Sequence, residues 1–434
     1  MQADLAEDYL LKTTVDTRAP FCLYVVWHPE CTDGKYLARQ VFDWFHAPSG
    51  ELHRSGLGIP VYYRTSKQGP PRPLEADEAQ HNVVVALVDH NLVADAGWRG
   101  FLAGCRHKNT TIFPVPLHRS AYQLSSVNAL NFLRVDGRKD GEEDPQQRQE
   151  RRGQRLRRQL TEVCARLLQK SLHGKTDETR ANLETILEKI QDEVDCLELR
   201  KYLAPVFRDE AGEPVTIFLS HAKADGTDVT EKLRMHVQTY GQLRSFYDES
   251  DLPIGYQFGN KLEEAVKEGG AMISVVTDAY ASRPWCRAEL AWARRPRLEE
   301  GSLSHWKVTP TLVVTAMSGG LTRTIPEIGN LPSIHWVPGR EQYILDLLLL
   351  EVLLASYHRL NAQSIVHRSG RHVISWVPDP ISVMELAATC RAEGLELNEL
   401  VYPGHGISAA EREAIKRIVP GTLTLRTYEE AWQE

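Results

Sequence analysis

Residues 215–221 read VTIFLSH, a short apolar run that ends in two polar side chains and precedes a segment of helical period over 227–240. The alternation of apolar run and helix continues through RSFYD, AMISVVT, VTPTLVVTA and SIHWVP, and it closes in a long apolar segment near 340–360. Buried strands that alternate with helices are typical of a parallel sheet covered on both faces. The pattern therefore predicts a five-stranded, doubly wound α/β domain over residues 211–362.

A similar alternation precedes this domain. The apolar runs FCLYVVW, IPVYYR, NVVVALV and TIFPVPL are separated by helical segments, one of them near 34–46. We predict that residues 1–136 form a second doubly wound domain, so that both domains are of the flavodoxin-like type. The two domains resemble distant copies of each other: when their sequences are aligned, Trp98 corresponds to Trp285 and Leu102 corresponds to Glu289. The alternative is the weak likeness that any two doubly wound domains share.

The remaining segments differ in composition. Residues 137–210 open with GRKDGEEDPQQRQ, which predicts an exposed charged loop from 137 to about 150. The stretches LTEVCARLLQ and LETILEKIQDEV then have apolar residues at helical spacing and predict two closing or linking helices over 151–199. Residues 363–434 contain HVISWVP, VMELAATCRAEG and ELVYP, which predict a small α/β extension at the C-terminus.

Composition limits the classes of function. The formal net charge is −7 and the sequence pI is about 6.2, which argues against a general binder of nucleic acid or of a membrane surface. The longest apolar stretch, LLLLEVLLASY, is interrupted by Glu351 and is too short to span a membrane. Seven cysteines without CxxC spacing, together with the acidic opening MQADLAEDYLLK, predict a cytoplasmic protein without a signal peptide. No metal site is expected, since no HExxH motif occurs.

Four segments of the domain at 211–362 together resemble the TIR (Toll/interleukin-1 receptor) domain, a family also found in bacterial and plant immune proteins. IFLSHAKAD is similar to the first box of that family, and FYDESDLPIGYQF to the loop after its second strand. MISVVTDAYASRPWCRAEL is similar to the third strand and the helix that follows, and SIHWVP is a weaker match to a late box. The most specific piece is the W-x-x-x-E spacing of Trp285 and Glu289.

The resemblance implies cleavage of the bond between nicotinamide and ribose in NAD⁺, which is then the substrate and not a cofactor. Such a bond breaks through an oxocarbenium-like state. Because nicotinamide leaves as a neutral molecule, one carboxylate that stabilises positive charge is enough. We predict that this catalytic residue is Glu289. The alternative interpretation is that Trp285 is a core aromatic side chain and Glu289 only a favourable acid in a first helical turn.

Contacts to NAD⁺ are expected at the carboxyl ends of the strands, where ligands of open α/β sheets bind. Lys223 could offset a pyrophosphate charge, and Asp248 could hold a ribose hydroxyl or simply cap its loop. Trp285 and Glu289 lie four residues apart, so that both can face one cleft. A Ser-His hydrolase is not predicted, because adjacent residues on a strand point in opposite directions. The predicted contacts are Ser220, His221, Lys223, Asp248, Gly255, Phe258, Thr277, Tyr280 and Trp285.

Three functions follow as hypotheses. The first is an NAD⁺ nucleosidase of antiviral or innate immune defence, which releases nicotinamide and ADP-ribose or a cyclic ADP-ribose. The resemblance implies that it is activated by homo-oligomerisation through other TIR domains, with an activating protein or ligand received by the N-terminal domain. The second is a non-catalytic TIR scaffold or adaptor, and the third is an enzyme like the nucleoside deoxyribosyltransferases.

Overall fold

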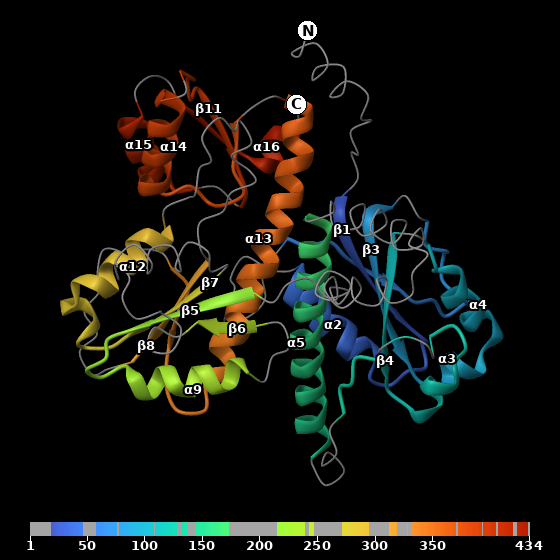
Figure 1. Ribbon diagram of the computed structural model, residues 1–434. Coiled ribbons are helices and arrows are strands. Elements are labelled where there is room, and N and C mark those ends of the chain that lie inside the picture. The colour runs from blue at the N-terminus through green and yellow to red at the C-terminus, as the bar shows by residue number, and fades with distance from the viewer. Residues whose placement is uncertain are drawn as a thin grey trace, which may run out of the picture. The chain divides into compact units, whose positions relative to one another are not determined.

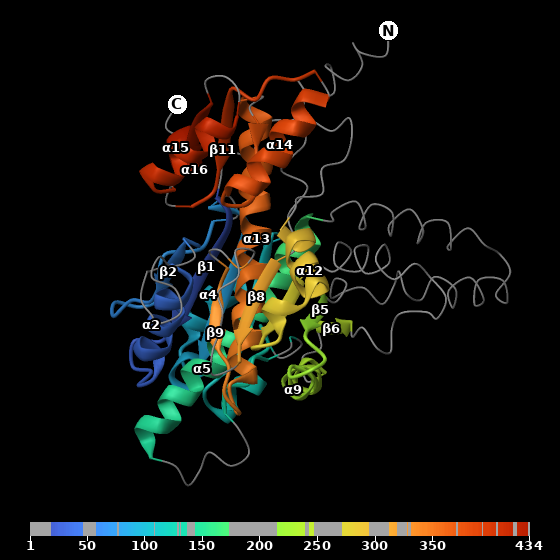
Figure 2. The same cartoon turned by 90° about the vertical axis from the view of Figure 1, so that its left-hand side faces the viewer.

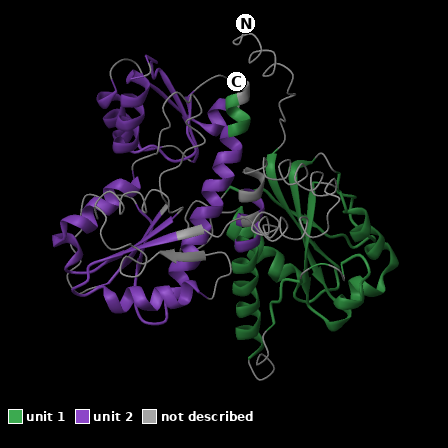
Figure 3. Cartoon of the chain, in the orientation of Figure 1, with its two compact units in different colours: residues 1–161, 363–370 green, residues 162–362, 371–434 purple. Residues whose placement is uncertain are grey.

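The structure is a computed structural model of the whole chain. It describes residues 19–46, 58–75, 78–107, 109–127, 130, 132–136, 144–172, 215–238, 243–246, 271–294, 312–318, 328, 331–369, 372–392, 394–404, 407–419 and 423–432. The chain divides into two compact units, which we describe separately (Figure 3). Unit 1 comprises residues 1–161 and 363–370, and unit 2 comprises residues 162–362 and 371–434. The three boundaries expected from the sequence, which separate four segments, remain predictions.

The described residues of unit 1 form a four-stranded parallel sheet of order β2-β1-β3-β4 (Figure 1). The central strands β1 and β3 are buried along most of their length, which explains why their sequences are almost continuous apolar runs. The elements are β1 (Ala19–Trp27), α2 (Gly34–Phe45), β2 (Val61–Arg64), β3 (Ala79–Val88), α3 (His90–Ala94), α4 (Ala96–Gly104), β4 (Thr110–Pro116), η1 (Arg119–Gln123) and α5 (Pro145–Leu172), of which residues up to 161 belong to this unit. The α/β architecture predicted for this part of the chain is confirmed.

The edge strand β4 contains two prolines, Pro114 and Pro116. On its outer side the carbonyl oxygen of Pro114 accepts a hydrogen bond from the Leu133 amide at 2.9 Å. A proline nitrogen carries no hydrogen, so neither proline can donate to a neighbouring strand.

Helix α5 corrects one sequence prediction. It begins at Pro145, inside the segment predicted to be a loop from 137 to about 150. The Asp144 carboxylate accepts hydrogen bonds from the Gln146 and Gln147 amides at 3.1 and 3.3 Å and so caps the helix. Proline at the first helical position is also favourable. The second helix predicted before residue 199 lies outside the described residues.

Arg152 fixes the first turns of α5 to the rest of unit 1. Its guanidinium donates to both carboxylate oxygens of Asp136, at 2.6 and 2.7 Å, and also to the Asp33 carboxylate. The Arg152 side chain is 9% exposed, and those of Asp33 and Asp136 are 28% and 34% exposed. These ion pairs join residues that are distant in the sequence, and they explain why local composition alone misjudged the start of the helix.

In unit 2 the described strands form a five-stranded sheet of order β6-β5-β7-β8-β9, in which every neighbouring pair is parallel. This order confirms the predicted flavodoxin-like fold. The elements are β5 (Val215–His221), α9 (Thr227–Val237), β6 (Leu243–Phe246), β7 (Ala271–Val276), η3 (Tyr280–Ser282), α12 (Pro284–Arg294), β8 (Leu312–Met317), β9 (Ser333–His335) and α13 (Glu341–Ser369), whose last residues belong to unit 1.

Helices cover both faces of this sheet (Figure 1). On one face, Leu233 of α9 and Leu348 of α13 pack in a cluster with Ile217 of β5. On the other face, Leu290 of α12 packs in a separate cluster with Phe218, the next residue of β5. Because side chains alternate along a strand, neighbouring residues of β5 supply the two cores.

The predicted C-terminal extension is a small α/β structure. Its three strands are parallel in the order β10-β11-β12, and helices α14 and α15 lie beside them (Figure 2). Leu386, Tyr402 and Ile415 share its core. Its elements are β10 (His372–Val373), α14 (Pro380–Ala392), β11 (Glu399–Tyr402), α15 (Ala409–Ile418), β12 (Thr424–Thr427) and α16 (Tyr428–Trp432). Within the described segments, no helix is both long enough and apolar enough to cross a membrane.

Candidate functional site

Three hydroxyl side chains form a row across the sheet of unit 2. Ser220 of β5 is in register with Ser274 of β7, and Ser274 is in register with Thr315 of β8. All three are buried, on the face that α12 covers. A row of polar side chains inside an apolar core is costly unless hydrogen bonds satisfy the oxygens, so the partners of these hydroxyls are informative.

Tyr280 in η3 supplies the partner for two of the three hydroxyls. Its phenol oxygen lies 2.8 Å from Ser220 Oγ and accepts a hydrogen bond from Ser274 Oγ at 2.9 Å. The phenol in turn donates to the Cys286 carbonyl oxygen at 3.1 Å. Burial, followed by the charge of the Glu289 carboxylate, raises the pKa of Tyr280 well above its ordinary value. The phenol therefore keeps its proton at neutral pH and acts as a donor.

Glu289 completes this group from α12. Its side chain is only 7% exposed, and its Oε2 accepts a hydrogen bond from Ser220 Oγ. Cys286, Leu290 and Ala293 of the same helix are buried as well, at the spacing of a helical face that packs on the sheet. The carboxyl group thus lies under the helix, at the carboxyl end of the inner strand β5.

A second contact joins the loops that follow β5 and β7. The Asp225 carboxylate accepts a hydrogen bond from Thr277 Oγ1 at 2.6 Å and another from the Ala279 amide at 2.9 Å. Cys286 Sγ lies 3.5 Å from the His221 carbonyl oxygen. These contacts hold the segment that leads into η3 and α12, and so they fix the position of Tyr280 relative to β5.

The predicted NAD⁺ contacts lie in different environments. Ser220, His221, Thr277 and Tyr280 are buried, whereas Lys223 is exposed. Trp285 is 51% exposed, and its ring centroid is 6.4 Å from that of Trp292. The alternative interpretation of Trp285 as a core aromatic side chain is therefore wrong. Asp248, Gly255 and Phe258 lie outside the described residues.

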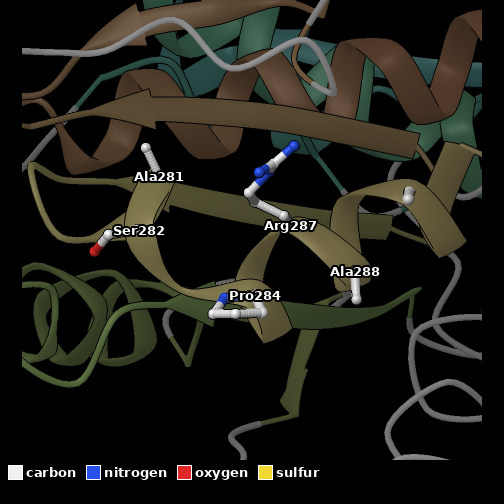
Figure 4. A pocket seen from close by; sticks show the side chains of 6 residues that line it. Ala281, Ser282, Pro284, Arg287 and Ala288 are labelled. Atoms are coloured by element: carbon white, nitrogen blue, oxygen red, sulfur yellow. The ribbon is translucent and has the colours of Figure 1, made fainter.

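A pocket of about 320 Å³ lies beside η3 and α12 (Figure 4). Its α12 residues, Pro284, Arg287, Ala288 and Ala291, recur at the spacing of one helical face, and that face differs from the one that carries Cys286, Leu290 and Ala293. Glu289 does not line this pocket. A ligand bound there would therefore meet the Arg287 side chain and not the Glu289 carboxyl group.

Two polar residues of this region were not predicted from the sequence. Ser274 was read as part of an apolar strand, although a serine inside AMISVV is itself a signal of a buried polar contact. Asp225 ends the segment IFLSHAKAD, and the sequence predicts no separate role for it. Its partners follow a different strand, and that pairing could not be read from local sequence.

The fold and the site define a class of protein first. A five-stranded parallel sheet of order 2-1-3-4-5, with helices on both faces and polar groups at the carboxyl end of its inner strand β5, is a flavodoxin-like α/β domain. Residues 217–342 match the TIR domain family, so this part of unit 2 is a TIR domain. A comparison with curated proteins gives no match.

Proposed function

We propose that the TIR domain is an NAD⁺ nucleosidase in which Glu289 is the catalytic residue. The observation that carries the proposal is the buried Glu289 carboxyl group, hydrogen-bonded to Ser220 at the carboxyl end of the inner strand β5. Ligands of open α/β sheets bind at this end of the strands. A carboxyl group held in a site of low dielectric also stabilises a nearby positive charge more strongly than one in water.

The reaction requires little from the protein beyond this charge. The bond between the ribose C1′ and the nicotinamide nitrogen breaks, and its electron pair leaves with nicotinamide. Water forms the new bond to C1′ and releases one proton, so the products are nicotinamide, ADP-ribose and H⁺; an adenine nitrogen in place of water gives the cyclic product. Glu289 would stabilise the oxocarbenium-like state on the ribose. Trp285, one helical turn earlier and half exposed, would offer an aromatic wall for the ribose or nicotinamide.

The wider role follows from the family. We propose that TIR domains of several copies assemble and that assembly activates cleavage in innate immune defence, with unit 1 receiving the activating protein or ligand. When the sequences of the two domains are aligned, Leu102 of unit 1 takes the position of Glu289, and its side chain is fully buried. Because unit 1 lacks the carboxylate proposed for catalysis, we propose that it controls the activity of the TIR domain and does not cleave NAD⁺ itself. We also propose that unit 1 and the TIR domain derive from a duplication, since both sheets contain the order 2-1-3-4.

A second candidate function is a TIR scaffold without catalysis. Two observations favour it: the pocket beside α12 is not lined by Glu289, and Trp285 exposes half of its surface. Exposed aromatic side chains are enriched in protein interfaces. On this hypothesis α12 would present Trp285 to a neighbouring TIR domain, and Glu289 would only stabilise the fold.

The deciding experiment is nicotinamide release from NAD⁺ by the purified full chain, measured over a range of protein concentrations. We expect turnover that rises as the chain assembles, and a loss of about 100-fold or more in Glu289→Gln. A matched control is Glu231→Gln, because Glu231 lies on α9 and is paired with Arg234 at 2.7 Å on the other face of the sheet. The control should keep full activity.

Other outcomes would favour the alternatives. Ordered assembly without nicotinamide release under any condition would favour the scaffold. Glycosyl transfer from a deoxynucleoside would favour the third hypothesis. A Glu289→Gln variant as active as the parent would refute the catalytic assignment.

A further inference from the structure

We infer that Ser220 and Tyr280 are positioning residues that hold the Glu289 carboxyl group and set the pH at which it ionises, instead of contacting NAD⁺ themselves. Ser220 is 1% exposed and Tyr280 is fully buried, so neither presents its hydroxyl to solvent. Ser220 contacts Tyr280 and Glu289, and Tyr280 contacts Ser220, Ser274 and the Cys286 carbonyl oxygen. For turnover this inference rests on the proposed function, but the ionisation of Glu289 can be measured without it.

The hydrogen-bond directions depend on the charge of Glu289. Among the described residues, four contacts join these side chains: Glu289 to Ser220, Ser220 to Tyr280, Ser274 to Tyr280, and Tyr280 to the Cys286 carbonyl. When Glu289 is ionised, the three hydroxyls supply three protons for these four contacts. Ser220 then donates to the carboxylate, and the Tyr280 proton is shared between Ser220 and the carbonyl.

When Glu289 is protonated, the group has four protons for four contacts. Glu289 then donates to Ser220, Ser220 donates to Tyr280, and Tyr280 donates to the Cys286 carbonyl, while Ser274 still donates to Tyr280. The Ser220 hydroxyl therefore rotates from Glu289 toward Tyr280 as the carboxyl group gains its proton. Ser220 thus has a hydrogen-bond partner whether Glu289 is ionised or neutral. When Glu289 is neutral, the Tyr280 phenol oxygen accepts the Ser220 proton.

This reversal predicts opposite effects for two substitutions. Ser220→Ala removes a charge-assisted hydrogen bond from the ionised form, which loses more than the neutral form, so the pKa of Glu289 should rise by about one unit. Tyr280→Phe removes the acceptor that Ser220 uses when Glu289 is protonated. The neutral form then loses more, and the pKa of Glu289 should fall by about half a unit.

Thr315 offers a matched control within the same row. It is fully buried and in register with Ser274, yet no described residue lies within hydrogen-bonding distance of its Oγ1. Thr315→Val keeps the shape of the side chain and removes only this hydroxyl. It should leave the ionisation of Glu289 unchanged.

The experiment is a pH titration of the full chain labelled with ¹³C at the glutamate carboxyl groups, followed by infrared spectroscopy. The Glu289 signal is assigned as the one that disappears in Glu289→Gln. We expect the midpoint to move up in Ser220→Ala, down in Tyr280→Phe and not at all in Thr315→Val. If the chain releases nicotinamide, the acid limb of the kcat profile should move in the same directions, with KM little changed.

The results separate this inference from the proposed function. A chain that assembles but releases no nicotinamide under any condition, while the two midpoints move in opposite directions, would refute the nucleosidase and keep the positioning role. An active chain whose Glu289 midpoint is unmoved in Ser220→Ala would refute the positioning role. Shifts of the same sign in all three variants would also refute it, because a general loosening of the core would produce them.

Discussion

Replacing Arg152 with methionine should loosen the attachment of α5 in unit 1. The guanidinium makes a bidentate contact with Asp136, at 2.6 and 2.7 Å, and a third contact with Asp33. Methionine keeps most of the aliphatic stem but leaves both carboxylates without this cation. The change therefore tests the ion pairs more than the packing.

The magnitude follows from burial. Removing one partner of a fully buried ion pair costs roughly 3–5 kcal/mol. Here the arginine is 9% exposed, but the aspartates are 28% and 34% exposed and can regain water when the cation is lost. We therefore expect the lower end, about 3 kcal/mol, which corresponds to an opening equilibrium about 100-fold more favourable.

Amide hydrogen exchange measures this change within unit 1 alone, which matters because unfolding of a chain with two units is not a single transition. Peptides from α2 and α5 should exchange about 100-fold faster in Arg152→Met. Arg148→Met is the control, since Arg148 is 43% exposed and lies 3.5 Å from the same Asp136. A surface contact of this kind contributes about 0–1 kcal/mol. Equal effects of the two substitutions would refute the assignment of the attachment to Arg152.

Two further predictions concern stability. Gly34→Ala would place a Cβ 2.3 Å from Cδ1 of the buried Trp27. Amide exchange in β1 should therefore show that the free energy of unfolding falls by about 1–3 kcal/mol. Burial raises the pKa of Glu351 to about 7 from 4.5, so the stability that the group contributes below pH 4.5 is lost as the pH rises through about 7. Amide hydrogen exchange of peptides from α13 should show that Glu351→Gln becomes more stable relative to the parent between pH 5 and 8, by up to about 3 kcal/mol. A constant difference across this range would contradict the burial of an ionisable Glu351.

The fold could be predicted because its determinants are local and periodic. Each buried strand of the two large sheets is a short apolar run, and the long helix α13 contains the apolar stretch near residue 350. The start of α5 could not be predicted in the same way. Its stability depends on Asp33 and Asp136, which reach Arg152 only after the chain has folded.

The candidate site could be predicted in part. The spacing of Trp285 and Glu289 predicted a shared helix, and α12 contains both. The sequence could not tell which of the two side chains would be buried, because that depends on how the helix rotates against the sheet. Nor could it reveal that Ser220 faces Glu289 and Tyr280, since strand residues alternate between faces whose partners are distant in the sequence.

The prolines of β4 limit how the first sheet can grow. In the second sheet, β8 is extended on its outer side by hydrogen bonds from the Thr315 amide to Pro332 and from the Trp336 amide to Met317. Pro114 and Pro116 offer no such amide, so a further strand beside β4 would leave its own carbonyl groups without donors at those positions. We therefore expect copies of this chain that assemble to join through surfaces other than a continuous sheet across β4.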